Sequence, residues 1–134
     1  MRRIWIATAM LGLAAAVCGA EVNQDWLKRV PSTERERVNP YRGRPQDVAA
    51  GARLYEDYCS RCHGADLQGT RGKPSLRTGV VENASDGELF WLLKNGDLRH
   101  GMPSWSSLPE AERWQILAYV RSAEQQTADA RPKR

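Results

Sequence analysis

Cys59-Ser60-Arg61-Cys62-His63 is the most informative stretch of this 134-residue chain. Two thiols lie three positions apart, and a histidine directly follows the second thiol. This C-x-x-C-H pattern is typical of covalent haem attachment, in which both thiols bond to vinyl groups of one porphyrin. The adjacent histidine is then carried beneath the iron, where it can serve as an axial ligand. The motif therefore predicts one haem c attached through Cys59 and Cys62, with His63 on the metal.

Two other chemistries use cysteine and histidine, and both fit less well. A zinc site needs four ligands, and the sequence offers only Cys59, Cys62, His63 and His100 outside residues 1–20. Adjacent Cys62 and His63 are awkward partners for a tetrahedral ion. A thioredoxin-like dithiol belongs to a strand–helix framework, and the sequence shows no strand pattern. The motif therefore favours covalent haem attachment over both.

The second iron ligand has two candidates. Met102 is the only methionine outside residues 1–20, and it lies in Gly101-Met102-Pro103. Glycine lets such a loop approach the porphyrin closely, and proline fixes the backbone beside the ligand. The competitor is His100, which would give a bis-histidine iron of lower potential. We predict that Met102 is the ligand and that His100 is a solvent-facing loop side chain.

Residues 1–20 have the organisation of a signal peptide. Arg2 and Arg3 precede an apolar run over residues 4–17, and small residues follow it. The run is shorter than the roughly 20 apolar residues of a spanning helix. We therefore predict a periplasmic protein with no stable membrane insertion after cleavage. The alternative is a retained anchor facing the periplasm, whereas acylation of Cys18 fits poorly after a valine.

Charge and cysteine content agree with export. The chain has 20 basic and 16 acidic residues, and loss of two arginines with the signal leaves 18 against 16, a formal charge of +2. Nucleic-acid binding needs a concentrated basic face, so we expect no nucleic-acid partner. Cleavage would also remove Cys18, which leaves the haem pair and no thiol for a disulfide.

The mature chain divides into a polar leader over residues 21–46, a helical domain over residues 47–122 and a flexible tail over residues 123–134. We expect the leader to be solvated on the domain surface rather than to dock a partner, with a short helix near residues 33–38. The first long helix is expected near residues 47–58, with Asp47 as its N-cap.

Two further helices are expected in the domain. Ser85 and Glu88 form a capping box for a helix that ends at Asn95-Gly96. The last helix should begin near Pro109 and run to about residue 122. The glycine-rich stretch between the first two helices offers no strand of useful length. The expected fold class is thus all-α, with three main helices around one haem, and such a small domain is marginal without its cofactor.

These motifs together resemble the class I monohaem c-type cytochromes. The resemblance covers roughly residues 47–122 and implies a cytochrome c-like fold. It implies that the Pro74 carbonyl accepts a bond from His63 Nδ1, which would orient the ring. It also implies that Leu76 packs on the haem face and that Trp105 lies near the haem edge. In this family the first and last helices cross, which implies that Gly51 and Tyr55 meet Ile116 and Tyr119.

The resemblance implies an electron-transfer protein rather than an enzyme. The implied role is a periplasmic one-electron shuttle between a dehydrogenase and a respiratory acceptor, either an oxidase or another cytochrome. Residues 39–43 and 87–91 also resemble cytochromes that accompany quinoprotein alcohol dehydrogenases, which makes such an enzyme a candidate donor. Two alternatives remain open: a fixed cytochrome subunit of a larger oxidoreductase, such as a quinoprotein dehydrogenase, and a ligand-binding haem protein.

Overall fold

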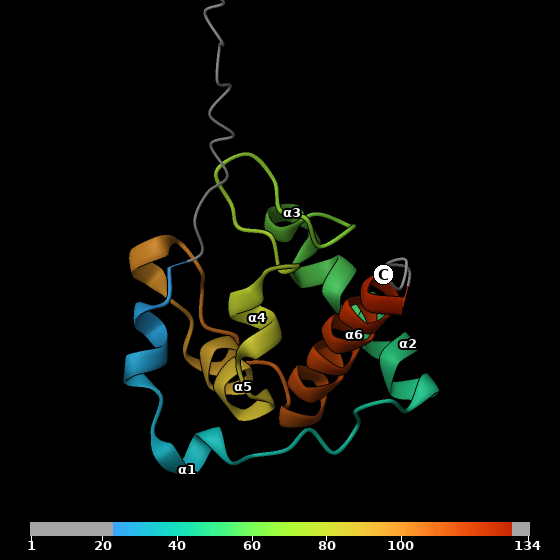
Figure 1. The fold of residues 1–134 in the computed structure, drawn as a ribbon, viewed down its shortest axis with the longest axis horizontal. Helices are drawn as coiled ribbons and strands as arrows, with labels where there is room; N and C mark the ends of the chain where they lie inside the picture. Colours follow the sequence, from blue (N-terminus) through green and yellow to red (C-terminus); the bar gives the residue numbers. More distant parts are fainter. Residues whose placement is uncertain (1–22, 130–134) are drawn as a thin grey trace, which may run out of the picture.

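The computed structural model describes residues 23–129 and shows an all-α architecture, as predicted (Figure 1). Those residues form no named strand, and their only β pairings are two isolated bridges, Thr70–Lys73 and Asp97–Met102. The signal predicted over residues 1–20 lies outside the described residues. The elements in chain order are η1 (Asp25–Arg29), α1 (Ser32–Arg35), α2 (Pro45–Tyr58), α3 (Ser60–His63), α4 (Gly79–Asn83), α5 (Asp86–Asn95), η2 (Leu98–His100) and α6 (Glu110–Asp129).

The N-terminus of α2 differs from the prediction. The helix begins at Pro45, and Arg44 rather than Asp47 is its N-cap residue. Proline suits the first helical position because its fixed φ matches the helix and its missing N–H is not needed there. Asp47 lies buried inside the first turn, where it accepts a hydrogen bond from Gln115 Nε2 at 2.9 Å. The carboxylate therefore ties α2 to α6 instead of capping α2.

Helices α2 and α6 pack closely where Gly51 faces α6 (Figure 1). A Cβ atom on Gly51 would lie 1.9 Å from the Gln115 carbonyl oxygen and 3.1 Å from the Ile116 nitrogen. One turn further on, the rings of Tyr55 and Tyr119 lie 5.3 Å apart. The contact that the family resemblance implied is present, and it explains a glycine within a helix despite its cost there.

Helix α5 begins with the predicted capping box. The Glu88 amide donates to Ser85 Oγ at 3.1 Å, and the Ser85 amide donates to Glu88 Oε2 at 2.7 Å. The helix ends at Gly96, whose φ of 70° lies in the left-handed region. Phe90 is fully buried and stacks on Trp114 with the ring centroids 3.9 Å apart. This stack joins α5 to α6.

Helix α6 continues to Asp129, beyond the expected end near residue 122. Ala123 is buried, so the helix still packs on the domain past that point. Residues 123–129 contain no glycine or proline that would end a helix. Part of the expected flexible tail is therefore helical, and residues 130–134 lie outside the described residues.

Most leader residues are exposed on the domain surface, as expected, but part of the leader packs into the core, which the expectation of a solvated segment missed. Trp26 and Val30 are among the buried residues. Helix α1 (Ser32–Arg35) packs on α5 at Gly87, where a Cβ atom would lie 1.8 Å from the Glu34 carbonyl oxygen. Two hydrogen bonds strengthen this contact: Ser85 Oγ donates to the Arg35 carbonyl at 2.8 Å, and Arg35 Nη1 donates to Glu88 at 2.6 Å.

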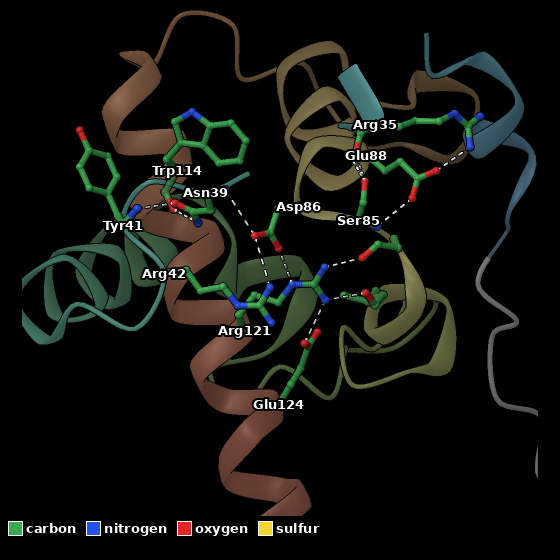
Figure 2. A network of polar contacts seen from close by, with 12 residues as sticks. Arg35, Asn39, Tyr41, Arg42, Ser85, Asp86, Glu88, Trp114, Arg121 and Glu124 are labelled. Atoms are coloured by element: carbon green, nitrogen blue, oxygen red, sulfur yellow. Dashed lines mark hydrogen bonds and ion pairs between the residues drawn. The ribbon is translucent and has the colours of Figure 1, made fainter. Parts of the chain in front are cut away.

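A buried polar network anchors the end of the leader (Figure 2). Asp86 accepts from Arg121 Nε at 3.0 Å and from Arg42 Nη1 at 3.4 Å. Arg121 also donates to the carbonyls of Val81, within α4, and of Ala84, the C-cap of that helix. Asn39 donates to the Trp114 carbonyl at 2.9 Å. The network thus connects the leader, α4, α5 and α6, because a buried carboxylate needs charged or hydrogen-bonding partners.

Candidate functional site

One apolar cavity of about 350 Å³ lies at the centre of the fold. Its volume falls in the range of small-molecule and cofactor sites, roughly 300–1,000 Å³. Side chains from α2, α4, α5 and α6 form its walls, together with the loops around residues 72–76 and 101–105. The structure brings every site residue predicted from the sequence to this cavity: Cys59, Cys62, His63, Pro74, Leu76, Met102 and Trp105.

The C-x-x-C-H residues form one helical turn at the end of α2. Cys59 is the C-cap of α2 and the N-cap of α3, and both the Cys62 and His63 amides donate to its carbonyl, at 3.1 and 2.9 Å. This turn carries both sulfur atoms and the imidazole to the same cavity. The two cysteines form no disulfide, and Cys59 is buried. Burial, with a smaller contribution from Cys62, raises the pKa of the Cys59 thiol to about 12.

His63 is oriented by a carbonyl oxygen. Its Nδ1 lies 2.9 Å from the Pro74 oxygen, which can only accept, so Nδ1 carries the proton. That tautomer leaves the lone pair on Nε2, the nitrogen that a metal would bind. Burial lowers the pKa of the imidazole, Lys73 acts in the same direction, and the bond to Pro74 opposes them. The ring is therefore favoured in the neutral form that binds metals.

The loop after His63 is built to present the Pro74 carbonyl. The Tyr55 hydroxyl donates to the Gly64 carbonyl at 2.7 Å, and burial raises the pKa of this hydroxyl. The Gly69 amide donates to the His63 carbonyl at 2.7 Å. A Cβ atom on Gly69 would lie 2.5 Å from the Lys73 oxygen, and its φ is 83°. Glycine is needed here because two backbone segments meet beside the histidine.

Met102 belongs to a closed loop that follows α5. The Asp97 amide donates to the Met102 carbonyl at 2.9 Å, and the Met102 amide donates to the Asp97 carbonyl at 3.1 Å. Gly101 has a φ of 81°, which the turn before Met102 requires. The Trp105 amide donates to the Leu93 carbonyl at 3.0 Å, which ties the far side of the loop to α5. The half-buried Met102 side chain lines the cavity.

His100 also borders the cavity, but both of its ring nitrogens have other partners. Nδ1 lies 2.7 Å from Asp97 Oδ2, and Nε2 lies 3.1 Å from Asn23 Nδ2. The side chain is 48% exposed, as expected for a loop residue. Within residues 23–129, no group of three or more histidine, cysteine, aspartate or glutamate side chains could hold a metal ion. The alternative zinc set of Cys59, Cys62, His63 and His100 is thus not assembled.

Two leader residues that the sequence reasoning missed also line the cavity. Trp26 is 3% exposed and contributes to the wall, and Asn23 lies at its edge. A local signal for this packing exists, because Trp26 and Val30 are apolar residues four positions apart in a polar segment. The polar composition around them outweighed that signal.

The residues around the cavity fit a haem. The structure supplies one neutral imidazole, one thioether and two thiols, which are the donor types of c-type haem proteins. Leu76 and Trp105 are partly buried and pack against the core, while Trp105 also contacts the Tyr58 ring at 5.3 Å. The remaining wall is largely apolar and includes Leu89, Leu92, Leu93, Ile116, Leu117 and Val120.

Comparison with known proteins agrees with this geometry. The chain is similar to thiosulfate dehydrogenase of Stutzerimonas stutzeri, with 28% identity over 116 residues that cover 74% of this chain and 36% of that protein. It is also similar to quinohemoprotein alcohol dehydrogenase ADH IIB of Pseudomonas putida, with 37% identity over 101 residues that cover 73% of this chain and 14% of that protein. The chain therefore spans well under half the length of either relative.

A solved structure shows the same fold. Cytochrome cL from Methylophaga aminisulfidivorans superposes with a TM-score of 0.58 at 24% identity, covering 89% of this chain and 87% of that one. The family model described as "Cytochrome C oxidase, cbb3-type, subunit III" matches residues 46–120, which is more than half of the chain. The chain therefore belongs to this family of electron-carrying, haem-binding cytochrome c proteins.

Proposed function

We propose that this protein is a one-electron carrier with one haem c, attached through Cys59 and Cys62 and ligated axially by His63 and Met102. The observation that carries the proposal is the convergence of all four side chains on one apolar cavity. Family membership supports the haem and the electron transfer. Attachment needs no oxidant, because addition of an S–H group across a vinyl double bond forms a thioether.

When bound, the haem supplies a reversible one-electron couple between Fe(II) and Fe(III). The protein's own residues set the properties of that couple. The Pro74 carbonyl oxygen accepts a hydrogen bond from His63 Nδ1 at 2.9 Å, which orients the ring and raises the basicity of Nε2. As an iron ligand, the Met102 sulfur would raise the reduction potential relative to a second histidine. Leu76 and Trp26 help to exclude water, which also favours the less charged ferrous form.

We further propose that the protein works in the periplasm, after export directed by residues 1–20. None of the helices in residues 23–129 is long and apolar enough to cross a membrane. The relatives named as dehydrogenases support a dehydrogenase as electron donor, with a quinoprotein enzyme as one candidate. The family description supports an oxidase as acceptor, and another cytochrome is the alternative. The role is electron transfer without catalysis of its own.

Covalent attachment is tested by mass and by extraction. The exported wild-type protein should be heavier than its mature polypeptide by one haem, and acidified organic solvent should not remove the pigment. The double variant Cys59→Ala and Cys62→Ala should lose this stable colour. Arg61→Gln changes an exposed residue of the same motif and should retain it. A colourless wild-type protein, or pigment that washes out, would refute the proposal.

Axial ligation is tested by spectroscopy. Ferric haem with a methionine ligand shows a weak near-infrared charge-transfer band, which Met102→Ala should abolish. His100→Ala should retain the band, because His100 is not the proposed ligand; loss of its bond to Asp97 should weaken the methionine ligation without abolishing it. If the wild type lacks the band and its ferrous form binds carbon monoxide readily, the protein is a ligand-binding haem protein instead.

The lengths of the relatives support a second candidate function. Because the matched parts are 36% and 14% of those proteins, a cytochrome of this type can serve inside a larger oxidoreductase. The protein would then be a fixed subunit rather than a shuttle. Size-exclusion chromatography of periplasmic extract separates the two: a shuttle elutes at the size of the free chain, and a subunit elutes with its enzyme.

A further inference from the structure

We propose that the leader element η1 (Asp25–Arg29) is a clamp that keeps Met102 on the iron. Arg29 holds the carboxylate of Asp97, and Asp97 pairs through its backbone with Met102. Arg29 and Asp97 are thus positioning residues that act through the loop. The inference rests on the proposed function, since it assumes that Met102 is an iron ligand.

The first step is the connection from Met102 to Asp97. Two backbone hydrogen bonds of 2.9 and 3.1 Å join these residues in both directions. The Asp97 carbonyl also accepts from the His100 amide at 2.9 Å. Gly96 precedes this short loop and Gly101 lies within it, and both have positive φ. Displacement of Asp97 would therefore move the Met102 backbone with it.

The second step is the burial of the Asp97 carboxylate. Its side chain is only 8% exposed, and each oxygen has a close partner. Arg29 Nη2 donates to Oδ1 at 2.8 Å, and His100 Nδ1 donates to Oδ2 at 2.7 Å. A buried carboxylate left without such partners is strongly unfavourable, so the ion pair determines where Asp97 lies.

The third step is the anchoring of η1 itself. Trp26, in the same short helix as Arg29, is buried and lines the cavity. The Arg29 guanidinium also lies 5.7 Å from the centroid of the Trp91 ring on α5. In Figure 1 the blue η1 segment lies beside the orange segment that follows α5. The Arg29 guanidinium therefore binds Asp97 from an element, η1, that is itself packed against the domain.

A second connection runs through His100. With Nδ1–H donating to Asp97, Nε2 is free to accept from the Asn23 amide at 3.1 Å. Asn23, Arg29 and the loop thus form one set of hydrogen bonds. Both leader residues precede the family match at residues 46–120. The clamp is accordingly an addition to the matched domain.

Imidazole competition measures the clamp on the ferric holoprotein. Free imidazole binds the iron only when the methionine leaves, so its apparent affinity falls with the stability of the methionine-bound state. Arg29→Gln and Asp97→Asn should each tighten apparent imidazole binding about tenfold, equivalent to about 1.4 kcal/mol. Their double variant should resemble the single variants rather than add their effects.

Two matched controls isolate the clamp. Lys28→Gln removes an ion pair with Asp25 on the exposed side of the same helix, where the two side chains are 81% and 70% exposed. Arg44→Gln removes a pair of similar burial to the clamp pair, the 2.9 Å contact with Asp47 at the start of α2, where the two side chains are 50% and 9% exposed. Both controls should bind imidazole within about twofold of the wild type, since the first pair is exposed and the second includes no residue of η1 or of residues 97–105.

The outcomes separate the two proposals. A wild type without the near-infrared band refutes methionine ligation and the clamp with it. A wild type with the band, but Arg29→Gln and Asp97→Asn affinities equal to the controls, refutes only the clamp. If Asp97→Asn does not accumulate as holoprotein, Arg29→Gln and Arg29→Lys decide, because Arg29 is 43% exposed at its side chain. Arg29→Lys keeps the charge and should show a smaller change than Arg29→Gln.

Discussion

The two sides of the cavity are held in different ways. The His63 side, residues 59–76, is fixed by short-range bonds: one helical turn carries both thiols and the imidazole, and Pro74 orients the ring at 2.9 Å. The Met102 side, residues 97–105, depends on Asp97, which is held from the leader by Arg29 at 2.8 Å. A local motif is therefore enough to place one proposed ligand, whereas the other depends on contacts between distant parts of the chain.

This difference predicts that substitutions on the two sides have different consequences. Damage to the His63 side should reach the whole fold, because α2 carries the motif and packs along α6. Damage to the Met102 side should loosen one proposed ligand, while the proposed attachment through Cys59 and Cys62 should keep the haem in place.

The largest effect is expected from Gly51→Ala. The new Cβ would lie 1.9 Å from the Gln115 carbonyl, so α2 and α6 must separate. We expect a loss of about 3 kcal/mol or more in the free energy of unfolding of the holoprotein, since backbone cannot move aside as a side chain can. Guanidinium denaturation followed by circular dichroism measures it.

Gly79→Ala is the matched control for that substitution. The Cβ at this α4 position would meet only Asn83 Nδ2, at 3.6 Å. We expect a stability within about 1 kcal/mol of the wild type, because the backbone there suits alanine. Equal denaturation midpoints for Gly51→Ala and Gly79→Ala would show that the α2–α6 contact does not limit stability.

Gly87→Ala should have the next largest effect on stability, and it acts on the Met102 side of the cavity. Its Cβ would lie 1.8 Å from the Glu34 carbonyl, but α1 is short and can move away from α5. We expect a loss of about 2 kcal/mol, because leader contacts are lost while the α2–α6 contact survives. Proteolysis in the leader should become faster, and imidazole should bind the ferric protein more tightly. Unchanged values for both would indicate that the leader tolerates the methyl group.

Tyr55→Phe tests the His63 side more gently. It removes the 2.7 Å bond from the hydroxyl to the Gly64 carbonyl and keeps the ring. We expect a loss of about 1 kcal/mol in unfolding free energy, the usual net contribution of one hydrogen bond. Imidazole affinity should not change, because Met102 is untouched. Tyr119→Phe, on the ring that packs against Tyr55, is the control. A change in imidazole affinity with Tyr55→Phe would contradict the separation of the two sides.

Much of the fold could be predicted because its signals are local. The Ser85–Glu88 capping box, the Gly96 terminator and the glycine at the α2–α6 contact are each recognised within a few residues or by family resemblance. The predicted start of α2 was wrong because two local signals compete. Pro45 favours the first helical position, whereas Asp47 favours an N-cap. The buried contact of Asp47 with Gln115 selects the start at Pro45.

The prediction for the leader was incomplete for a different reason. Its polar composition indicates a solvated segment, yet Trp26 lies inside the cavity wall and Arg29 neutralises a buried carboxylate. An arginine that serves a distant aspartate looks the same in the sequence as a surface arginine. The burial of Asp97, which creates the need for that partner, depends on how α5 and the following loop pack. The position of the loop on the Met102 side therefore depends on tertiary packing, which cannot be recognised from a local stretch of sequence.

The smallest effect concerns the contact that joins the two sides. Tyr58 ends α2 and Trp105 follows Met102, and their rings lie 5.3 Å apart with an interplanar angle of 57°. Tilted aromatic pairs contribute about 0.5–1.5 kcal/mol beyond burial, and Tyr58 is 42% exposed, so we expect about 0.5 kcal/mol of coupling. A double-mutant cycle with Tyr58→Leu and Trp105→Leu measures it on unfolding free energy and on imidazole affinity. Coupling in both quantities would show that the His63 side supports the methionine loop through this pair. Coupling in unfolding alone would leave the leader as the support of that loop, and strictly additive effects in both would mean that the rings touch without linking the two sides.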